Sequence, residues 1–349
     1  MHCHVLVPDA FWPLQETTDA MSGLALEALE TLIARGRRES SPALAAERWL
    51  LESFGVERQS DWPASPYCLL ADGRASGIVP GEDFWMCADP VHLRLEGSEL
   101  LLVDGNACAV KIEEAEIVAR DVNRHFAGSF TLMPQHPERW YLRLPSAPDM
   151  ETEPLASVSG RSITAHLPRG PDAIRWQGVA NELQMLLHEH PVNTAREARG
   201  ELAINSLWLW GAGRAAQPQS KPYRLVLAND PLACGLAQAS GAQAAPLPEN
   251  ASAWLDRESE SGIVLLVLDS LREPSRRADA PAWRDRFIGI DRDWFAPLAR
   301  ALRQHRIGMV TLHLLGPQRT LHVETADTDM RRFWRRGKPL ATWAAGKED

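Results

Sequence analysis

Short apolar runs that end in a carboxylate or a turn recur along the chain, and amphipathic runs separate them. Residues 3–7 are mostly apolar and lead to Asp9, which is typical of a buried parallel strand. The pattern returns in four later runs: 204–210, 223–228, 263–269 and 307–314. Helical spacing predicts helices over four stretches: 24–34, 42–54, 179–189 and 294–305. Strands that alternate with helices predict an α/β fold with a doubly wound, mostly parallel sheet.

The stretch from 89 to 173 has a different pattern. Two apolar runs flank Gly97-Ser98, which predicts a β-hairpin. A helix is predicted over 111–126, and two further strands over 130–133 and 140–144. This order indicates a small α+β domain with an irregular Pro-rich and Ser-rich exit. We therefore expect an α/β domain over 1–88 and 174–349, interrupted by an inserted domain over 89–173.

Charge and composition narrow the class of protein. The formal net charge is -9 and the pI is about 5.7, so the overall field repels nucleic acid and anionic membranes. No uncharged apolar run reaches the roughly 20 residues that a membrane span requires. The five cysteines are scattered and form no CxxC pair, which favours a reducing compartment. We expect a cytoplasmic protein without direct nucleic-acid binding.

Several short groups of residues could bind a metal or a phosphate, and each could equally have a purely structural role. Asp9 and Asp269 follow predicted strands, where carboxylates can bind a metal, although Asp269 can equally cap a helix. Gly211-Ala212-Gly213-Arg214 could hold a phosphate or form a tight turn, and it matches neither GxGxxG nor GxxxxGK.

Two histidine clusters favour structural roles. His2, Cys3 and His4 cannot all face one ion, because side chains alternate along a strand. His188 and His190 do not share a helix face. We expect His190 to lie at a helix end before Pro191 and to bond the terminal carbonyls there.

The most specific pattern is the block from Asn181 to Gly213. It contains His190-Pro191-Val192-Asn193, then Arg196 and Gly200, then Asn205 to Gly213. This block resembles the signature of the archaeal-type cofactor-independent phosphoglycerate mutases. The resemblance implies an alkaline-phosphatase-like α/β domain with a small inserted cap domain. It also implies ligand or phosphate contacts from seven residues: His190, Asn193, Arg196, Asn205, Gly211, Gly213 and Arg214.

In that family two divalent metals such as Mn or Mg activate a serine nucleophile. Either Ser40 or Ser41 would match the serine, and we take Ser41 as the candidate. Asp9, Asp269 and His322 would match metal ligands, which is too few for a pair of dications. Where the family has a histidine after Asp269, this chain carries Arg272, Arg276 and Arg277 nearby. We therefore expect no metal cofactor, and keep as the alternative a metal-dependent phosphotransferase or phosphatase with a reduced site.

The chain also resembles bacterial pathogenicity-factor regulators of the RpfE type, which share the Asn181–Gly213 block and the ending Arg332 to Leu340. Just there lies a basic-aromatic segment: Arg331, Arg332, Phe333, Trp334, Arg335 and Arg336. This segment is either a solvated helix end or a docking surface for an acidic protein or a nucleic-acid backbone. We expect a pseudoenzyme that binds a phosphorylated ligand or a protein partner, a single-strand DNA exonuclease being one candidate partner.

Overall fold

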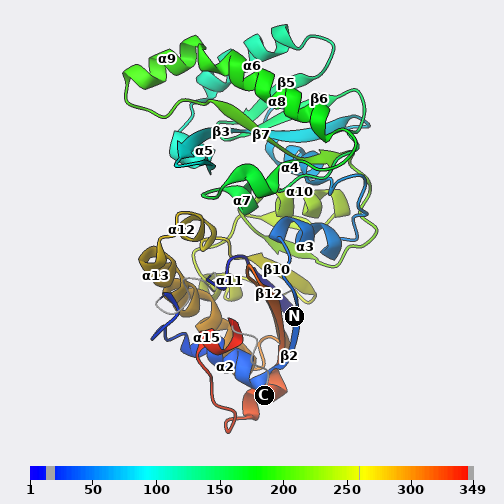
Figure 1. Ribbon diagram of the computed structural model, residues 1–349. Coiled ribbons are helices and arrows are strands. Elements are labelled where there is room, and N and C mark those ends of the chain that lie inside the picture. The colour runs from blue at the N-terminus through cyan, green and yellow to red at the C-terminus, as the bar shows by residue number, and fades with distance from the viewer. Residues whose placement is uncertain (13–19, 259, 345–349) are drawn as a thin grey trace. The chain divides into compact units, whose positions relative to one another are not determined.

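The computed structural model describes residues 1–12, 20–258 and 260–344, and its chain divides into two compact units (Figure 1). The first unit combines Met1–Leu50 with Ser220–Asp349, and the second is Leu51–Gln219. Within the described ranges, no helix is both long and apolar enough to cross a membrane.

The first unit is built on a seven-stranded sheet in the described part of the chain, with the order β2-β12-β11-β1-β10-β8-β9. β1 pairs in parallel with β10 on one side and with β11 on the other. β12 and β2 extend the sheet with antiparallel pairing. The strands are β1 (His2–Val7), β2 (Arg37–Pro42), β8 (Leu225–Leu227), β9 (Gln243–Ala245), β10 (Ile263–Val267), β11 (Met309–Leu315) and β12 (Arg319–Ala326).

One face of this sheet forms the main hydrophobic core. Side chains alternate along each strand, so Cys3, Val5 and Val7 point into the core while His2 and His4 point to the opposite face. The helices of the unit are α2 (Glu27–Arg35), α3 (Ala46–Ser53), α10 (Pro231–Ser240), α11 (Ala251–Leu255), α12 (Arg272–Arg276), α13 (Ala280–Ile290), η3 (Asp291–Phe295), α14 (Ala296–Arg303), η4 (Asp327–Arg331) and α15 (Leu340–Ala344). The boundary between the two units falls within α3.

The second unit contains a separate antiparallel sheet with the order β4-β3-β6-β5, to which β7 is added by pairing with β3. α6 and α8 pack against this sheet and against each other. Its elements are α4 (Ala64–Asp72), β3 (Phe84–Glu96), β4 (Glu99–Val103), α5 (Gly105–Cys108), α6 (Ile112–His125), β5 (Thr131–His136), β6 (Arg139–Leu144), α7 (Leu155–Val158), η2 (Ile163–His166), α8 (Ala173–His188), α9 (Pro191–Ala198) and β7 (Ser206–Gly213).

The predicted mixed α/β fold with a mostly parallel sheet is confirmed. The interpretation of 204–210 as a strand of that sheet is wrong, because β7 pairs antiparallel with β3 instead. The predicted insertion, 89–173, lies inside the second unit. This unit begins earlier and ends later in the sequence, because β7 pairs with β3 and α4 contacts both strands.

The predicted helix over 42–54 begins only at Ala46, and the polar residues before it form β2. These residues have no strand pattern of their own. They are extended because β12 offers an antiparallel partner from Arg319 to Glu324.

Candidate functional site

Three carboxylates lie at the same edge of the parallel sheet in the first unit. Asp9 follows β1, Asp230 follows β8 and Asp269 follows β10. These strands are parallel neighbours in the order β1-β10-β8, so their carboxyl ends meet at one edge. Ligand sites of open α/β sheets lie at such edges. The position of Asp9 and Asp269 at strand ends is therefore as the sequence predicted.

Backbone conformation and hydrogen bonds hold two of these residues, Asp9 and Asp230, in place. Asp9 has φ 55, a left-handed conformation that Asp tolerates better than bulkier residues, and its carbonyl accepts from Trp283 Nε1 at 2.9 Å. Asp230 caps α10, and its carboxylate accepts from the Ala233 amide at 2.9 Å. Burial raises the pKa of Asp230, while Arg272 and that amide act in the opposite direction.

Arg272, the first residue of α12, brings a cation to this edge. Its Nη1 lies 2.8 Å from Glu47 Oε1, and both side chains are largely buried. Burial opposes the charged form of Arg272, but the carboxylates of Glu47, Asp230 and Asp9 outweigh it and raise the pKa of the guanidinium. Among the residues that the structure describes, the buried Nε atom of Arg272 has no hydrogen-bond partner. The edge thus holds an ion network centred on arginine.

The predicted metal ligands do not form a metal-binding group. Across the described residues, no three His, Cys, Asp or Glu side chains are arranged to hold a metal ion, and Asp9, Asp269 and His322 are no exception. His322 instead lies in β12, which β11 separates from β1. There it accepts or donates within a chain of imidazoles.

That histidine chain crosses the polar face of the sheet. Ser41 Oγ lies 3.3 Å from His322 Nε2, and His322 Nδ1 lies 2.9 Å from His313 Nδ1. His313 Nε2 in turn lies 3.0 Å from His4 Nδ1. His322 and His313 therefore each use one nitrogen as a donor and the other as an acceptor, while His4 takes part through Nδ1. Two opposite directions of donation satisfy the chain, and one of them lets Ser41 donate to His322.

Burial keeps these imidazoles neutral. Together with smaller contributions from neighbouring histidines, it lowers the pKa of His4 to about 4 and that of His313 to about 2. Burial also lowers the pKa of His322, which Glu39 partly offsets. Trp49 packs on the His313 ring, with centroids 4.5 Å apart. The sequence favoured a structural role for His4 but did not reveal its partner, because His313 lies 309 positions away in the sequence.

The Asn181–Gly213 block lies entirely in the second unit, where its polar side chains bond to the chain itself. Asn193 donates to the carbonyls of Leu187 and Ile204 and accepts from the Ile204 amide, each at 2.8 Å. Asn205 exchanges two hydrogen bonds with the Leu93 backbone, at 2.7 and 2.9 Å. These asparagines replace missing backbone partners where α9 leads to β7.

His190 does not end α8 by bonding its carbonyls, as we expected. It is the N-cap of α9, where its Nδ1 accepts from the Val192 amide at 3.2 Å, and its Nε2 faces Asp121 at 3.2 Å. Pro191 opens α9, since its missing N–H needs no partner in a first helical turn.

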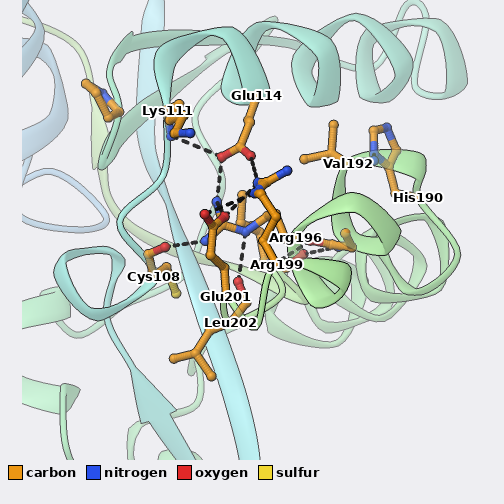
Figure 2. A network of polar contacts seen from close by, with 12 residues as sticks. Cys108, Lys111, Glu114, His190, Val192, Arg196, Arg199, Glu201 and Leu202 are labelled. Carbon is orange, nitrogen blue, oxygen red and sulfur yellow. Dashed lines mark hydrogen bonds and ion pairs between the residues drawn. The ribbon is translucent and has the colours of Figure 1, made fainter.

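Arg196 is the centre of the polar network in Figure 2, and its side chain is fully buried. Its guanidinium donates to the carbonyls of Leu202, at 2.8 Å, and of Cys108, and it pairs with Glu114 at 2.5 Å. Arg199 binds the other oxygen of Glu114 at 2.6 Å. The pairing of Arg196 with α6 joins α9 to the rest of the second unit.

The turn at the end of β7 is also held internally. Gly211 has φ 68, a conformation that favours glycine, and its amide donates to Thr152 Oγ1 at 2.9 Å. A Cβ atom on Gly213 would lie 2.5 Å from Pro63 Cβ. Arg214 has its side chain over the Phe84 ring, 5.3 Å from the centroid. These contacts explain the glycines by close packing without a ligand.

The basic-aromatic segment from Arg331 to Arg336 begins at the last residue of η4 in the first unit. Phe333 and Trp334 are 77% and 66% exposed, and their rings meet edge to face at 5.4 Å. Arg332 pairs with Asp329 at 3.0 Å, whereas Arg335 and Arg336 are exposed. Two large exposed aromatic side chains thus lie in the same segment as exposed arginines.

Comparison with known proteins gives partial sequence similarity to one enzyme. No family model matches the chain. A probable 2,3-bisphosphoglycerate-independent phosphoglycerate mutase of Geobacter sulfurreducens is 39% identical over 71 residues, which is 20% of this chain and 18% of the relative. The same enzyme of Methanothrix thermoacetophila is 31% identical over 115 residues, 33% of this chain and 29% of the relative. The chain thus matches less than a third of the length of either relative.

Solved structures match over nearly the full length. The cofactor-independent phosphoglycerate mutase of Thermoplasma acidophilum has a TM-score of 0.50 at 18% identity, covering 99% of this chain and 95% of its own. A protein of Pyrococcus horikoshii has a TM-score of 0.56 at 14% identity, covering 98% and 92%. The chain therefore shares the alkaline-phosphatase-like α/β fold of these two structures.

Sequence reasoning missed Asp230, Glu47 and the histidine partners at the sheet. Asp230 had a local signal, since Asp230-Pro231 after an apolar run is typical of a helix start. Glu47 and His313 had none, because only the folded sheet brings them to Arg272 and His4.

Proposed function

We propose that this chain is a non-catalytic relative of the cofactor-independent phosphoglycerate mutases that acts as a regulatory protein. The observation that carries the proposal is the ion pair of Arg272 with Glu47 at the strand-end carboxylates. Phosphoryl transfer in this superfamily needs dications to neutralise the charge that develops on the phosphate. A site whose carboxylates already face a guanidinium is poorly suited to that task.

We place partner binding on the basic-aromatic segment Arg331–Arg336. Its exposed Phe333 and Trp334 supply apolar contact area, and its arginines supply charge and bidentate hydrogen bonding. The partner that fits is a protein with an acidic, partly apolar surface. A single-strand DNA exonuclease is the candidate to test first, and a phosphorylated small molecule is the alternative ligand.

A turnover assay tests the non-catalytic part of the proposal. Purified protein is incubated with Mn²⁺ and 3-phosphoglycerate, and separately with a generic phosphate ester. We expect no conversion above that of the Ser41→Ala variant. Conversion that Ser41→Ala and Asp9→Ala both abolish would instead establish the alternative, a metal-dependent phosphotransferase or phosphatase with a reduced site, which the Ser41–His322 contact favours.

A direct binding measurement tests the partner. The purified exonuclease is titrated onto immobilised wild-type protein and onto the Phe333→Ala/Trp334→Ala variant, whose side chains are exposed and add little to stability. We expect the variant to lose binding. The matched control is Ile174→Ala/Met185→Ala, which removes exposed apolar side chains from α8 of the second unit and should bind like the wild type.

We also propose a cytoplasmic location. All five cysteines are free thiols, and four of them are buried, as suits a protein of a reducing compartment.

A further inference from the structure

Cationic side chains from two distant parts of the sequence gather at the C-terminal end of α2 in the first unit. Arg38 Nη1 donates to the Ile33 carbonyl at 3.3 Å, and Arg332 Nη1 donates to the Arg35 carbonyl at 3.4 Å. Both bonds lie where a helix leaves carbonyls without intrahelical partners. Arg35 Nη1 in turn donates to the Met330 carbonyl at 2.7 Å. The end of α2 and the basic-aromatic segment are therefore bonded to each other.

The chain beyond the basic-aromatic segment stays at the same place. A Cβ atom on Gly337 would lie 2.9 Å from Glu30 Cβ, so the backbone runs closely against α2 there. Arg38 and Lys338 both lie over the Trp343 ring of α15, at 4.7 and 6.0 Å from its centroid. Arg38 is therefore a neighbour of Lys338, although 300 positions separate the two in the sequence.

The local charge at this place is opposite in sign to that of the whole molecule. Residues 329–338 contain five cations and one acid, a net charge of +4 in a chain whose total is -9. The acid, Asp329, is paired with Arg332 at 3.0 Å. Arg38 and Lys338 are both exposed. An anionic group that approaches the basic-aromatic segment thus also meets these two cations.

This surface offers a ligand two kinds of contact. Arg38 and Arg332 are held by their bonds to carbonyls, so less side-chain entropy is lost when their remaining N–H groups bind a carboxylate. Phe333 and Trp334 supply exposed apolar area. A free phosphate would use the cations alone, and a nucleic acid is repelled by the net charge of the chain. A peptide that carries both carboxylates and apolar side chains would use all of these contacts.

We propose that the end of α2, the basic-aromatic segment and Lys338 form one composite docking surface, which takes an acidic peptide segment with apolar side chains from a partner protein. The inference rests on the proposed function of the basic-aromatic segment and extends it by Arg38 and Lys338, which lie outside that segment. Arg38 provides the sharper test, because only the fold brings it to this surface.

The experiment is a titration of a fluorescein-labelled peptide, in which Asp alternates with Phe, with the full chain, followed by fluorescence anisotropy. A second peptide carries Asn in place of each Asp. We expect the wild type to bind the Asp peptide and to bind the Asn peptide much more weakly. Arg38→Ala should weaken binding of the Asp peptide by about 2–5-fold, as the loss of one exposed ion pair does. Arg38→Ala/Lys338→Ala should weaken it further.

Three further variants separate binding from folding. Arg277→Ala removes an exposed arginine from α12, which lies away from α2, and should bind like the wild type (Figure 1). Arg38→Lys keeps the positive charge and should recover part of the affinity. Lys338→Ala removes an exposed side chain, so it provides a folded variant if thermal unfolding shows that Arg38→Ala does not fold.

Four results would overturn the inference. One is no binding of the Asp peptide, and another is equal binding of the Asp and Asn peptides. A third is binding that Arg335→Ala/Arg336→Ala abolishes but Arg38→Ala/Lys338→Ala leaves unchanged, because the surface would then be confined to the basic-aromatic segment. A fourth is displacement of the peptide by a single-stranded oligonucleotide at physiological salt. The third result would leave the proposed function intact, and failure of the exonuclease to bind would leave the peptide result unchanged.

Discussion

At the scale of single residues, buried charges carry much of the specificity of this molecule. Arg196 and Arg272 each place a guanidinium inside one unit and face it with glutamate. Neither pair is a solvent-exposed ion pair of little energetic weight. Removal of one partner would leave the charge of the other buried with less compensation. The partner of Asp89 in β3 is of a different kind. Its buried carboxylate accepts a hydrogen bond from a neutral group, Trp210 Nε1, at 2.7 Å.

Arg196→Ala should destabilise the protein by about 3–5 kcal/mol, because it removes the buried partner of Glu114 and the guanidinium donors of two backbone carbonyls. Arg199→Ala, which removes a more exposed arginine from the same glutamate, should destabilise the protein much less, because water screens exposed ion pairs. Urea unfolding of both variants measures the difference. Equal losses would show that the burial of Arg196 adds nothing.

Asp89 should make the folded state less stable as the pH rises. Burial raises its pKa to about 7, against the hydrogen bond from Trp210, whereas in the unfolded chain it ionises near 3.8. Between these values the folded state binds the extra proton, so the free energy of unfolding falls from about pH 4 to pH 7. Asp89→Asn should remove this component. An unchanged slope in the variant would rule out Asp89 as its source.

At the scale of elements, the two sheets differ in what their sequences reveal. β1, β10 and the hairpin of β3 with β4 were predictable, because short apolar runs and a Gly-containing turn carry local information. β7 was predictable as a strand, but the sheet to which it belongs was not. The pattern of apolar residues does not indicate which strand pairs with it. β2 was not predictable at all, because its polar residues become extended only against β12.

The same limit applies to the candidate site. Asp9 and Asp269 could be located because strand ends are visible in the sequence. The contact between His4 and His313 joins residues 309 positions apart, and no local pattern connects them. The ion pair of Arg272 with Glu47 joins residues 225 positions apart, so it too has no local signal in the sequence.

The histidine chain gives the sheet of the first unit an acid sensitivity of opposite sign to that of Asp89. Burial lowers the pKa of His4 to about 4, while the unfolded residue titrates near 6.5. Below pH 6.5 the unfolded state therefore binds more protons, and the free energy of unfolding falls as the pH drops toward 4. Protonation also gives one ring two donors and breaks the order of donation along the chain.

His4→Gln should flatten the acid limb of this pH profile. The measurement is urea unfolding between pH 4 and pH 7, and His188→Gln, at an exposed position on α8, is the matched control. We expect the control to follow the wild type. A His4→Gln profile as steep as that of the wild type would mean that other groups cause the acid sensitivity.

At the scale of the whole molecule, the charge distribution disfavours a nucleic acid as partner and allows an acidic protein. A net charge of -9 repels a phosphate backbone at long range, while the Arg331–Arg336 segment offers a local cationic surface. Screening limits the reach of that segment to about 8 Å at physiological ionic strength. Contact with an acidic protein surface needs no longer range than this.

The protein should therefore not bind an oligonucleotide at physiological salt. Fluorescence anisotropy of a labelled single-stranded DNA, titrated with protein at about 0.15 M salt, should give no saturable signal. Binding that weakens with added salt and is lost in Arg335→Ala/Arg336→Ala would contradict this, and would make the segment a nucleic-acid contact.

The division of the first unit into two stretches of sequence sets the order in which the protein forms during synthesis. β1 sits between β10 and β11, whose residues emerge from the ribosome more than 250 positions later. The second unit, Leu51–Gln219, has its own core and strand partners, so it can fold before the partner strands of β1 are synthesised. Until β10 is synthesised, residues 2–7 therefore lack the strand partners that they have in the folded sheet.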